Sequence, residues 1–127
     1  MGGKFHIPHG RANGILLPYV MSFNAGCAEQ LTPTAKRYAQ ISRLLRLDTS
    51  SVRQSALNMI RTARTFIKKM NMPCTIEAGV TKEQFEAELD EMAAAALADR
   101  CTATNPQPVT VEDIKEIYRK AFIGKLP

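Results

Sequence analysis

The stretch VRQSALNMIRTARTFIKKM, residues 52–70, carries the pattern that decides the fold class. Apolar side chains recur in it at spacings of three and four residues, at Val52, Ala56, Met59, Ile60, Ala63, Phe66, Ile67 and Met70. This spacing places them on one face of a helix, which we expect to lie in the core. Beside that face, a basic stripe is expected from four side chains within about 80° of one another, Arg53, Arg61, Arg64 and Lys68.

The segments before this stretch also have helical signals. Residues 48–51 supply a turn and an N-cap for it. The Thr32 hydroxyl and Pro33 are typical of a helix start, which predicts a helix from there to about Leu47. Residues 10–23 are apolar almost all round, so we expect a helix buried on most sides, with a kink at Pro18 and an end at residues 24–26.

The segments after it predict two more helices. Thr81 and Gln84 form a capping-box pattern, followed by the inward positions Phe85, Leu89, Met92, Ala93, Ala96 and Leu97. Pro106 and Pro108 predict an ordered loop over residues 100–108. Thr110 and Asp113 cap a last helix that ends at Gly124, with Ile114, Ile117, Tyr118, Ala121 and Phe122 inward. Without an alternating strand pattern, the chain is expected to be all-α, a bundle of about five main helices.

Length and charge bound the possible functions. At 127 residues, with 45% hydrophobic and 23% charged residues, the chain is expected to form a single all-helical unit over 1–127. Residues 1–72 hold eleven basic and two acidic residues, a sum of +9, and the rest holds six and ten, a sum of −4. This asymmetry indicates either an anionic partner, such as a nucleic acid, or two oppositely charged surfaces that meet each other or a neighbouring protein. We favour the second interpretation.

The cysteines and the apolar segments indicate a compartment. Three widely spaced cysteines without a CxxC pair are typical of a reducing cytoplasm, where we expect the protein to reside. The longest apolar stretch, residues 14–23, is far shorter than the roughly 20 residues that cross a bilayer, so no membrane span is expected.

Few residues are candidates for chemistry. His6 and His9 are the only histidines, and two imidazoles do not complete a zinc site, which takes three or four protein ligands. For Cys101, at the start of its loop, a buried structural thiol is the default interpretation. The basic stripe lacks the interleaved aromatic residues of single-strand binders, which argues against nucleic-acid binding as its role. There is no GxGxxG, phosphate-loop, GxSxG or HExxH motif.

Two separated motifs resemble a known family. FHIPHGRAN, residues 5–13, followed by ILLP, residues 15–18, resembles the "PHG, A-N, LP" signature of the iron-containing (group III) alcohol dehydrogenases. Cys101-Thr102 with Asn105-Pro106 resembles their late "CT, NP" loop. The resemblance covers essentially the whole chain and implies the later part of the family's C-terminal, all-helical iron-binding domain. The N-terminal nucleotide-binding domain is absent from this sequence. Gly14 departs from the family by replacing a better helix former.

The resemblance also implies cofactors and site residues. In the family, Fe²⁺ is held by an aspartate and three histidines, and the last histidine matches His9 here; the other three ligands would precede Met1. Cys101 matches a position lining the pocket near the nicotinamide, and no catalytic residue carries over. The implied reaction transfers hydride between a short-chain alcohol or aldehyde and NAD(P), with iron acting as a Lewis acid.

With one ligand of four, we expect the isolated chain to be inactive unless an upstream polypeptide or a homo-oligomer completes the site. The alternative is a non-catalytic helical module for assembly or nucleic-acid contact.

Overall fold

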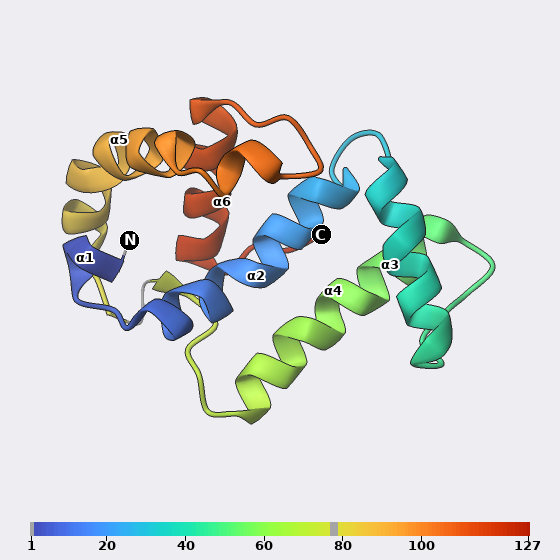
Figure 1. Ribbon diagram of the computed structural model, residues 1–127. Helices are drawn as coiled ribbons and strands as arrows, with labels where there is room; N and C mark the ends of the chain where they lie inside the picture. Colours follow the sequence, from blue (N-terminus) through green and yellow to red (C-terminus); the bar gives the residue numbers. More distant parts are fainter. Residues whose placement is uncertain (1, 77–78) are drawn as a thin grey trace.

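The computed structural model describes residues 2–76 and 79–127, and these residues form helices and loops with no β-strand. In chain order the elements are α1 (Gly2–Phe5), α2 (His9–Ala25), α3 (Pro33–Leu44), α4 (Val52–Lys69), α5 (Lys82–Ala98), the short 3₁₀ turn η2 (Thr102–Thr104) and α6 (Val111–Ile123) (Figure 1). The all-α fold class is confirmed, and α2 to α6 are the five main helices that the sequence predicts. The single turn α1 was not predicted. Among the described residues, no helix is long and apolar enough to cross a membrane.

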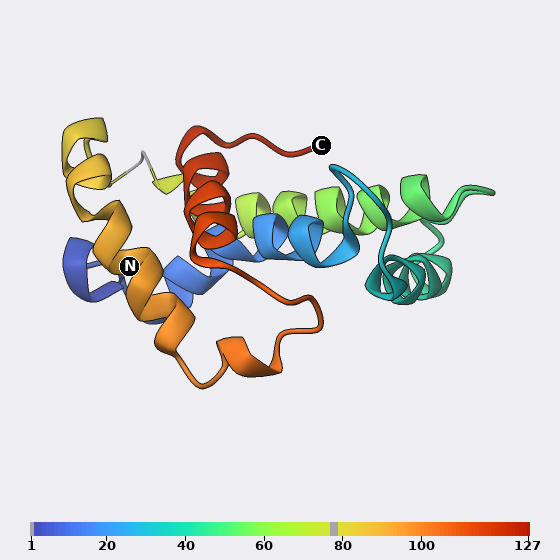
Figure 2. The same ribbon diagram turned by 90° about the horizontal axis from the view of Figure 1, so that it is seen from above.

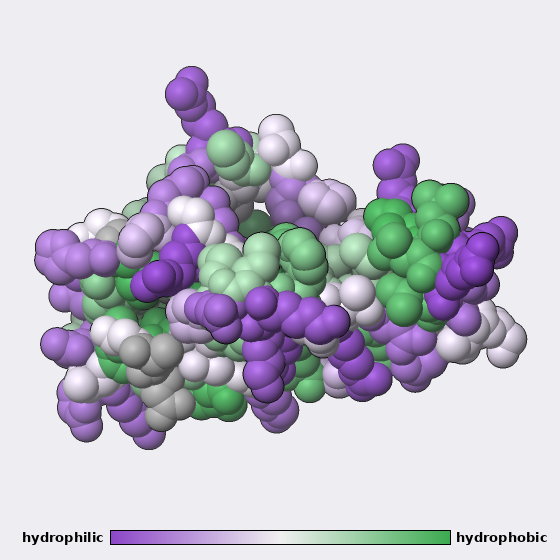
Figure 3. Space-filling view, turned by 90° about the horizontal axis from the view of Figure 1, so that it is seen from below, coloured by the Kyte–Doolittle hydropathy of each residue, from purple (hydrophilic) through white to green (hydrophobic). Residues whose placement is uncertain are grey.

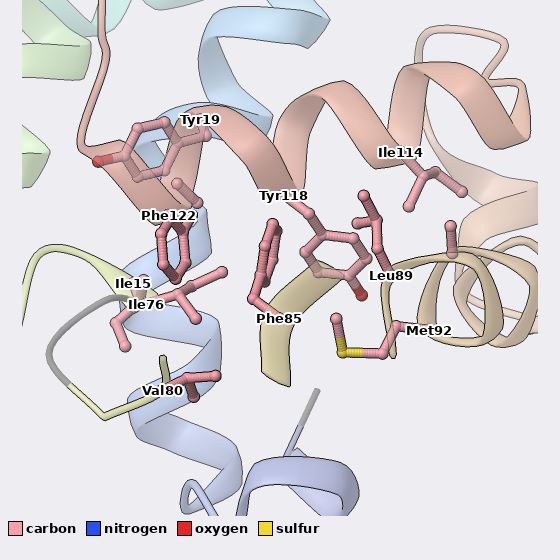
Figure 4. Close-up of a cluster of buried hydrophobic side chains, with 12 residues drawn as sticks. Ile15, Tyr19, Ile76, Val80, Phe85, Leu89, Met92, Ile114, Tyr118 and Phe122 are labelled. Atoms are coloured by element: carbon pink, nitrogen blue, oxygen red, sulfur yellow. The ribbon is translucent and has the colours of Figure 1, made fainter. Parts of the chain in front are cut away.

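Helix α2 lies at the centre and links two groups of helices. Helices α3 and α4, which cross each other, pack on one side of it, and α5 and α6 pack on the other (Figures 1 and 2). The larger core cluster joins α2 to α5 and α6, and in it the rings of Phe85 and Phe122 stack with centroids 4.6 Å apart (Figure 4). A second cluster joins the far half of α2 to α3 and α4 through Met21, Ala25, Ala35, Ala56 and Ile60. The predicted burial of this helix on most sides is thereby confirmed.

Most helix ends follow the predicted signals. Both capping boxes are formed, Thr81 with Gln84 and Thr110 with Asp113, and Ser51 accepts a hydrogen bond from the Gln54 amide at 3.2 Å. Gly26 ends α2 at φ +67°, where a Cβ would lie 2.0 Å from the carbonyl oxygen of Gln30, so only glycine fits there. The hydroxyl of Thr32 does not cap α3. It donates instead to the carbonyl oxygen of Asn24.

Two predictions about α3 and α4 are corrected. Helix α3 ends at Leu44 rather than near Leu47. On α4, Ala56, Ile60 and Ile67 are buried as expected, but three members of the predicted core face, Val52, Phe66 and Met70, are exposed. At 100° per residue, Val52, Phe66 and Met70 lie along one edge of the apolar face, whereas the buried residues Ala56, Ile60 and Ile67 lie further round it. The neighbouring helices therefore cover only part of this face. Leu97 near the end of α5 is also exposed rather than inward.

The basic stripe of α4 is used within the chain. Arg53 donates hydrogen bonds to the carbonyl oxygens of Cys27 and Glu29, Arg64 donates to that of Gly124 at 3.0 Å, and Arg61 donates to that of Pro127 at 3.0 Å. These arginines hold the loop after α2 and the C-terminal tail against α4. Because the acceptors are neutral carbonyl oxygens, these contacts occupy the guanidinium groups without pairing the basic half of the chain with the acidic half.

Gly14, the departure from the family pattern, has a local reason. A Cβ at this position would lie 2.6 Å from the terminal methyl carbon of Met72, which follows α4. The missing side chain therefore leaves room for Met72 to pack against α2.

Candidate functional site

His9 is the first residue of α2, and its imidazole is exposed. The Nδ2 atom of Asn13, one turn further along the helix, lies 3.0 Å from the His9 Nε2 atom. His6 stands in the preceding loop with φ +53° and is also exposed. The structure gives the His9 ring a polar neighbour on its own helix and leaves its other side open.

Five residues of α2 are exposed, Gly10 and Arg11 in its first turn and three others that form a stripe along the helix. His9, Asn13 and Leu17 follow one another at one-turn spacing, and all three are exposed on a helix that otherwise supplies both core clusters. We call these three residues the α2 stripe. It is the face of the central helix that remains available to another polypeptide.

The loop after α5 holds Cys101 at the surface. The Cys101 amide donates to the Asp99 carboxylate at 2.7 Å, the Thr102 hydroxyl donates to the carbonyl oxygen of Ala96, and the Thr104 hydroxyl donates to that of Cys101 at 2.9 Å. These bonds fix the loop from within and leave the thiol exposed. The default interpretation of Cys101 as a buried structural thiol is therefore wrong.

A pair of amides joins this loop to α2. Asn24 Nδ2 donates to Asn105 Oδ1 at 3.1 Å, and Asn105 Nδ2 donates to Asn24 Oδ1 at 2.7 Å and to the carbonyl oxygen of Gln107 at 2.7 Å. Sequence reasoning assigned Asn24 only to the end of a helix and missed this contact. The sequence shows an asparagine in each of the two segments, but no feature of the sequence indicates that these two side chains contact each other.

These contacts do not bring the two predicted site residues, His9 and Cys101, close to each other. His9 and Asn24 lie at opposite ends of α2, about 22 Å apart at 1.5 Å per residue. The loop with Cys101 is bonded to the Asn24 end. A groove of about 560 Å³ beside that end is lined by residues of α2, α6 and the tail, and neither His9 nor Cys101 lines it.

Two other titratable side chains near α2 are kept neutral. Burial raises the pKa of Tyr19, whose hydroxyl donates to the carbonyl oxygen of Cys74 at 3.0 Å. Burial likewise raises the pKa of the Cys27 thiol. Both groups therefore behave as structural groups of the core.

The described residues do not form a metal centre by themselves. Over residues 2–76 and 79–127, no three side chains of His, Cys, Asp or Glu gather closely enough to hold a metal ion. An iron centre needs several protein donors in a fixed geometry, and His9 supplies one. The residues present therefore do not fit a complete iron site.

Comparison with known proteins gives one consistent result. Residues 1–122 match the Fe-containing alcohol dehydrogenase family, C-terminal. The NADPH-dependent butanol dehydrogenase of Clostridium saccharobutylicum is 32% identical over 97% of this chain and 30% of its own length. The alcohol dehydrogenase of Thermococcus barophilus is 38% identical over 91% of this chain and 28% of its own length. The crystal structure of an iron-containing alcohol dehydrogenase from Thermococcus thioreducens superposes with a TM-score of 0.79 at 34% identity, covering 94% of this chain and 29% of that one. The chain thus spans about 30% of the length of these relatives.

Proposed function

The chain belongs to the iron-containing alcohol dehydrogenase family, as part of its C-terminal domain, and from this premise we propose that it is the C-terminal portion of an iron-dependent oxidoreductase. In this proposal the complete enzyme transfers hydride between a short-chain alcohol or aldehyde and NAD(P). The relatives support this substrate class by name, as a butanol dehydrogenase, a lactaldehyde reductase and a 1-propanol dehydrogenase. Because the chain spans about 30% of them, the activity is assigned to a longer assembly and not to this chain alone.

The α2 stripe carries this proposal. It exposes one imidazole, that of His9, at the start of a helix whose other residues include most of those that join the two core clusters. In our proposal His9 is one iron ligand, and the remaining ligands and the nucleotide-binding surface come from an upstream polypeptide that covers this stripe. Cys101, exposed in its fixed loop, is proposed to line the cofactor pocket of the same assembly. The three free thiols support a reducing compartment, and we place the protein in the cytoplasm.

The alternative role as a nucleic-acid module has less support. Three arginines of the basic stripe donate hydrogen bonds to carbonyl oxygens of the chain itself. Their guanidinium groups are therefore only partly free for phosphates, which dominate nucleic-acid affinity.

A chimera tests the proposal. Residues 1–122 replace the matching C-terminal segment of the Clostridium saccharobutylicum butanol dehydrogenase. We expect the chimera to bind iron and to oxidise butanol with NADP. His9→Ala should abolish both properties, whereas the matched variant His6→Ala, which removes the other exposed histidine, should retain them. A folded chimera that keeps its iron and its activity with His9→Ala would refute the ligand assignment.

A further inference from the structure

The outer end of the α3–α4 pair presents apolar side chains to solvent. Leu44 is 84% exposed and Leu45 51% exposed, and Ile41 lies one turn before them and is also exposed. Apolar surface gathers at this end of the molecule in the space-filling view (Figure 3). We call these three residues the α3 tip. An apolar patch with a polar rim is typical of an interaction surface.

The α3 tip is held rigidly. Leu47 donates its amide to the carbonyl oxygen of Ser42 at 2.8 Å, and Asn58 donates to the carbonyl oxygen of Leu47 at 2.8 Å. The buried Ser42 hydroxyl donates to the carbonyl oxygen of Ser55 at 2.6 Å. Arg46 takes the left-handed conformation at φ +58°, which glycine usually occupies after a helix. The leucines therefore face outward from an ordered helix end and not from a frayed one.

The charge around the α3 tip selects its partner. Three basic residues lie on α3, Lys36, Arg37 and Arg43, and Arg46 follows directly after it, whereas no acidic residue occurs between residues 30 and 47. None of the four forms an ion pair within the part of the chain that the structure describes. Two copies that met through this same patch would bring like charges together. The tip is complementary to a surface that combines small apolar residues with carboxylates.

The outer face of α5 has that combination. Glu83 and Glu86 are exposed near its start, without an ion pair among the described residues. Ala94, Leu97 and Ala98 are exposed near its end. The spacing also agrees. Arg37 precedes Leu44 by seven residues, or about 10.5 Å of helix, and Glu86 precedes Ala94 by eight, or about 12 Å.

We propose that the α3 tip of one copy packs on the outer face of α5 in a second copy, with Leu44 against Ala94 and Arg37 beside Glu86. The two surfaces lie at opposite ends of the molecule (Figures 1 and 2), so one copy does not pair them within itself. Such a contact between unlike surfaces leaves one of each free at the ends and adds further copies in a row. The patch is small compared with a stable interface, so the association is weak. The inference does not depend on the proposed enzymatic role.

Analytical ultracentrifugation of the intact 127-residue chain tests this contact. Between about 10 µM and about 1 mM, we expect the weight-average mass to rise with concentration and to fall again with added salt. Leu44→Gln should abolish this rise by removing the tip, and Ala94→Arg should abolish it by blocking the α5 face. Both positions are exposed, and circular dichroism checks that each variant remains helical.

Mixing the two variants distinguishes this arrangement from others. Each variant retains one intact surface, so an equimolar mixture should form a pair of one copy of each and grow no further. A wild-type chain that stays monomeric at about 1 mM would overturn the proposal. So would a mixture that stays monomeric, an Ala94→Arg variant that still associates, or a tip that binds anionic phospholipid vesicles without any self-association.

Discussion

At the scale of single residues, the contact between Asn24 and Asn105 joins the end of α2 to the second family motif. Asn24 is 6% exposed, and both amide groups are paired with each other. A buried polar group that loses its partner costs more free energy than the hydrogen bond contributes when it is made. The pair therefore fixes the position of the Cys101 loop against α2.

Asn105→Ala is expected to lower the free energy of unfolding by about 1–3 kcal/mol, because the buried Asn24 amide is left without its partner. Chemical denaturation measures this change. Asn24→Ala should cost a similar amount, and the double variant should cost clearly less than the sum of the two, since the interaction is lost only once. Strictly additive costs would show that the two amides do not interact in solution.

The same contact shows where sequence reasoning ends. The pattern around Asn105 predicted an ordered loop, because two prolines restrict the backbone there. The partner of Asn105 lies 81 residues away, and no local rule links the two amides. The exposure of Cys101 was missed for a related reason, since it depends on the bonds to Asp99 and Ala96 that turn the loop outward.

At the scale of elements, α4 shows that the apolar sequence pattern of a helix and the residues that the fold buries are not the same. The apolar periodicity that predicts this helix continues along its whole length, but the covered part is centred on Ala56, Ile60 and Ile67. Helix existence and type follow from spacing and caps within a few residues, which is why the five main helices and both capping boxes were predictable. Which apolar residues are buried depends on which part of the apolar face the neighbouring helices cover, and the local pattern does not contain that information.

Neighbouring residues of α4 test this distinction. Ile67→Ala should lower the free energy of unfolding by about 2–4 kcal/mol, because it removes buried methyl groups and leaves a cavity. Phe66→Ala should cost less than about 1 kcal/mol, since Phe66 is 62% exposed although its side chain is larger. Thermal or urea denaturation compares the two. A larger loss for Phe66→Ala would show that the Phe66 side chain is covered in solution.

At the scale of the whole molecule, α2 organises the fold and the site together. It supplies residues to both core clusters and ends at Gly26 beside the paired amides, while the α2 stripe begins with His9. The sequence allowed the prediction that this helix is mostly buried, because its residues are apolar nearly all round. The sequence also made the resemblance to the family recognisable, because the two motifs occur in the order that the family has. That His9 is an iron ligand stays a proposal, and the fold adds that its imidazole is exposed at the start of α2.

The measurement that tests this account most directly is the iron bound per chain. The intact 127-residue protein is incubated anaerobically with ferrous iron, desalted and analysed for metal, with circular dichroism to confirm that it is helical. A single imidazole does not fix a coordination geometry, so we predict no stoichiometric iron in the isolated chain and stoichiometric iron in the chimera with its intact upstream part. Stoichiometric iron in the isolated chain that is lost with His9→Ala would contradict the need for ligands from an upstream polypeptide.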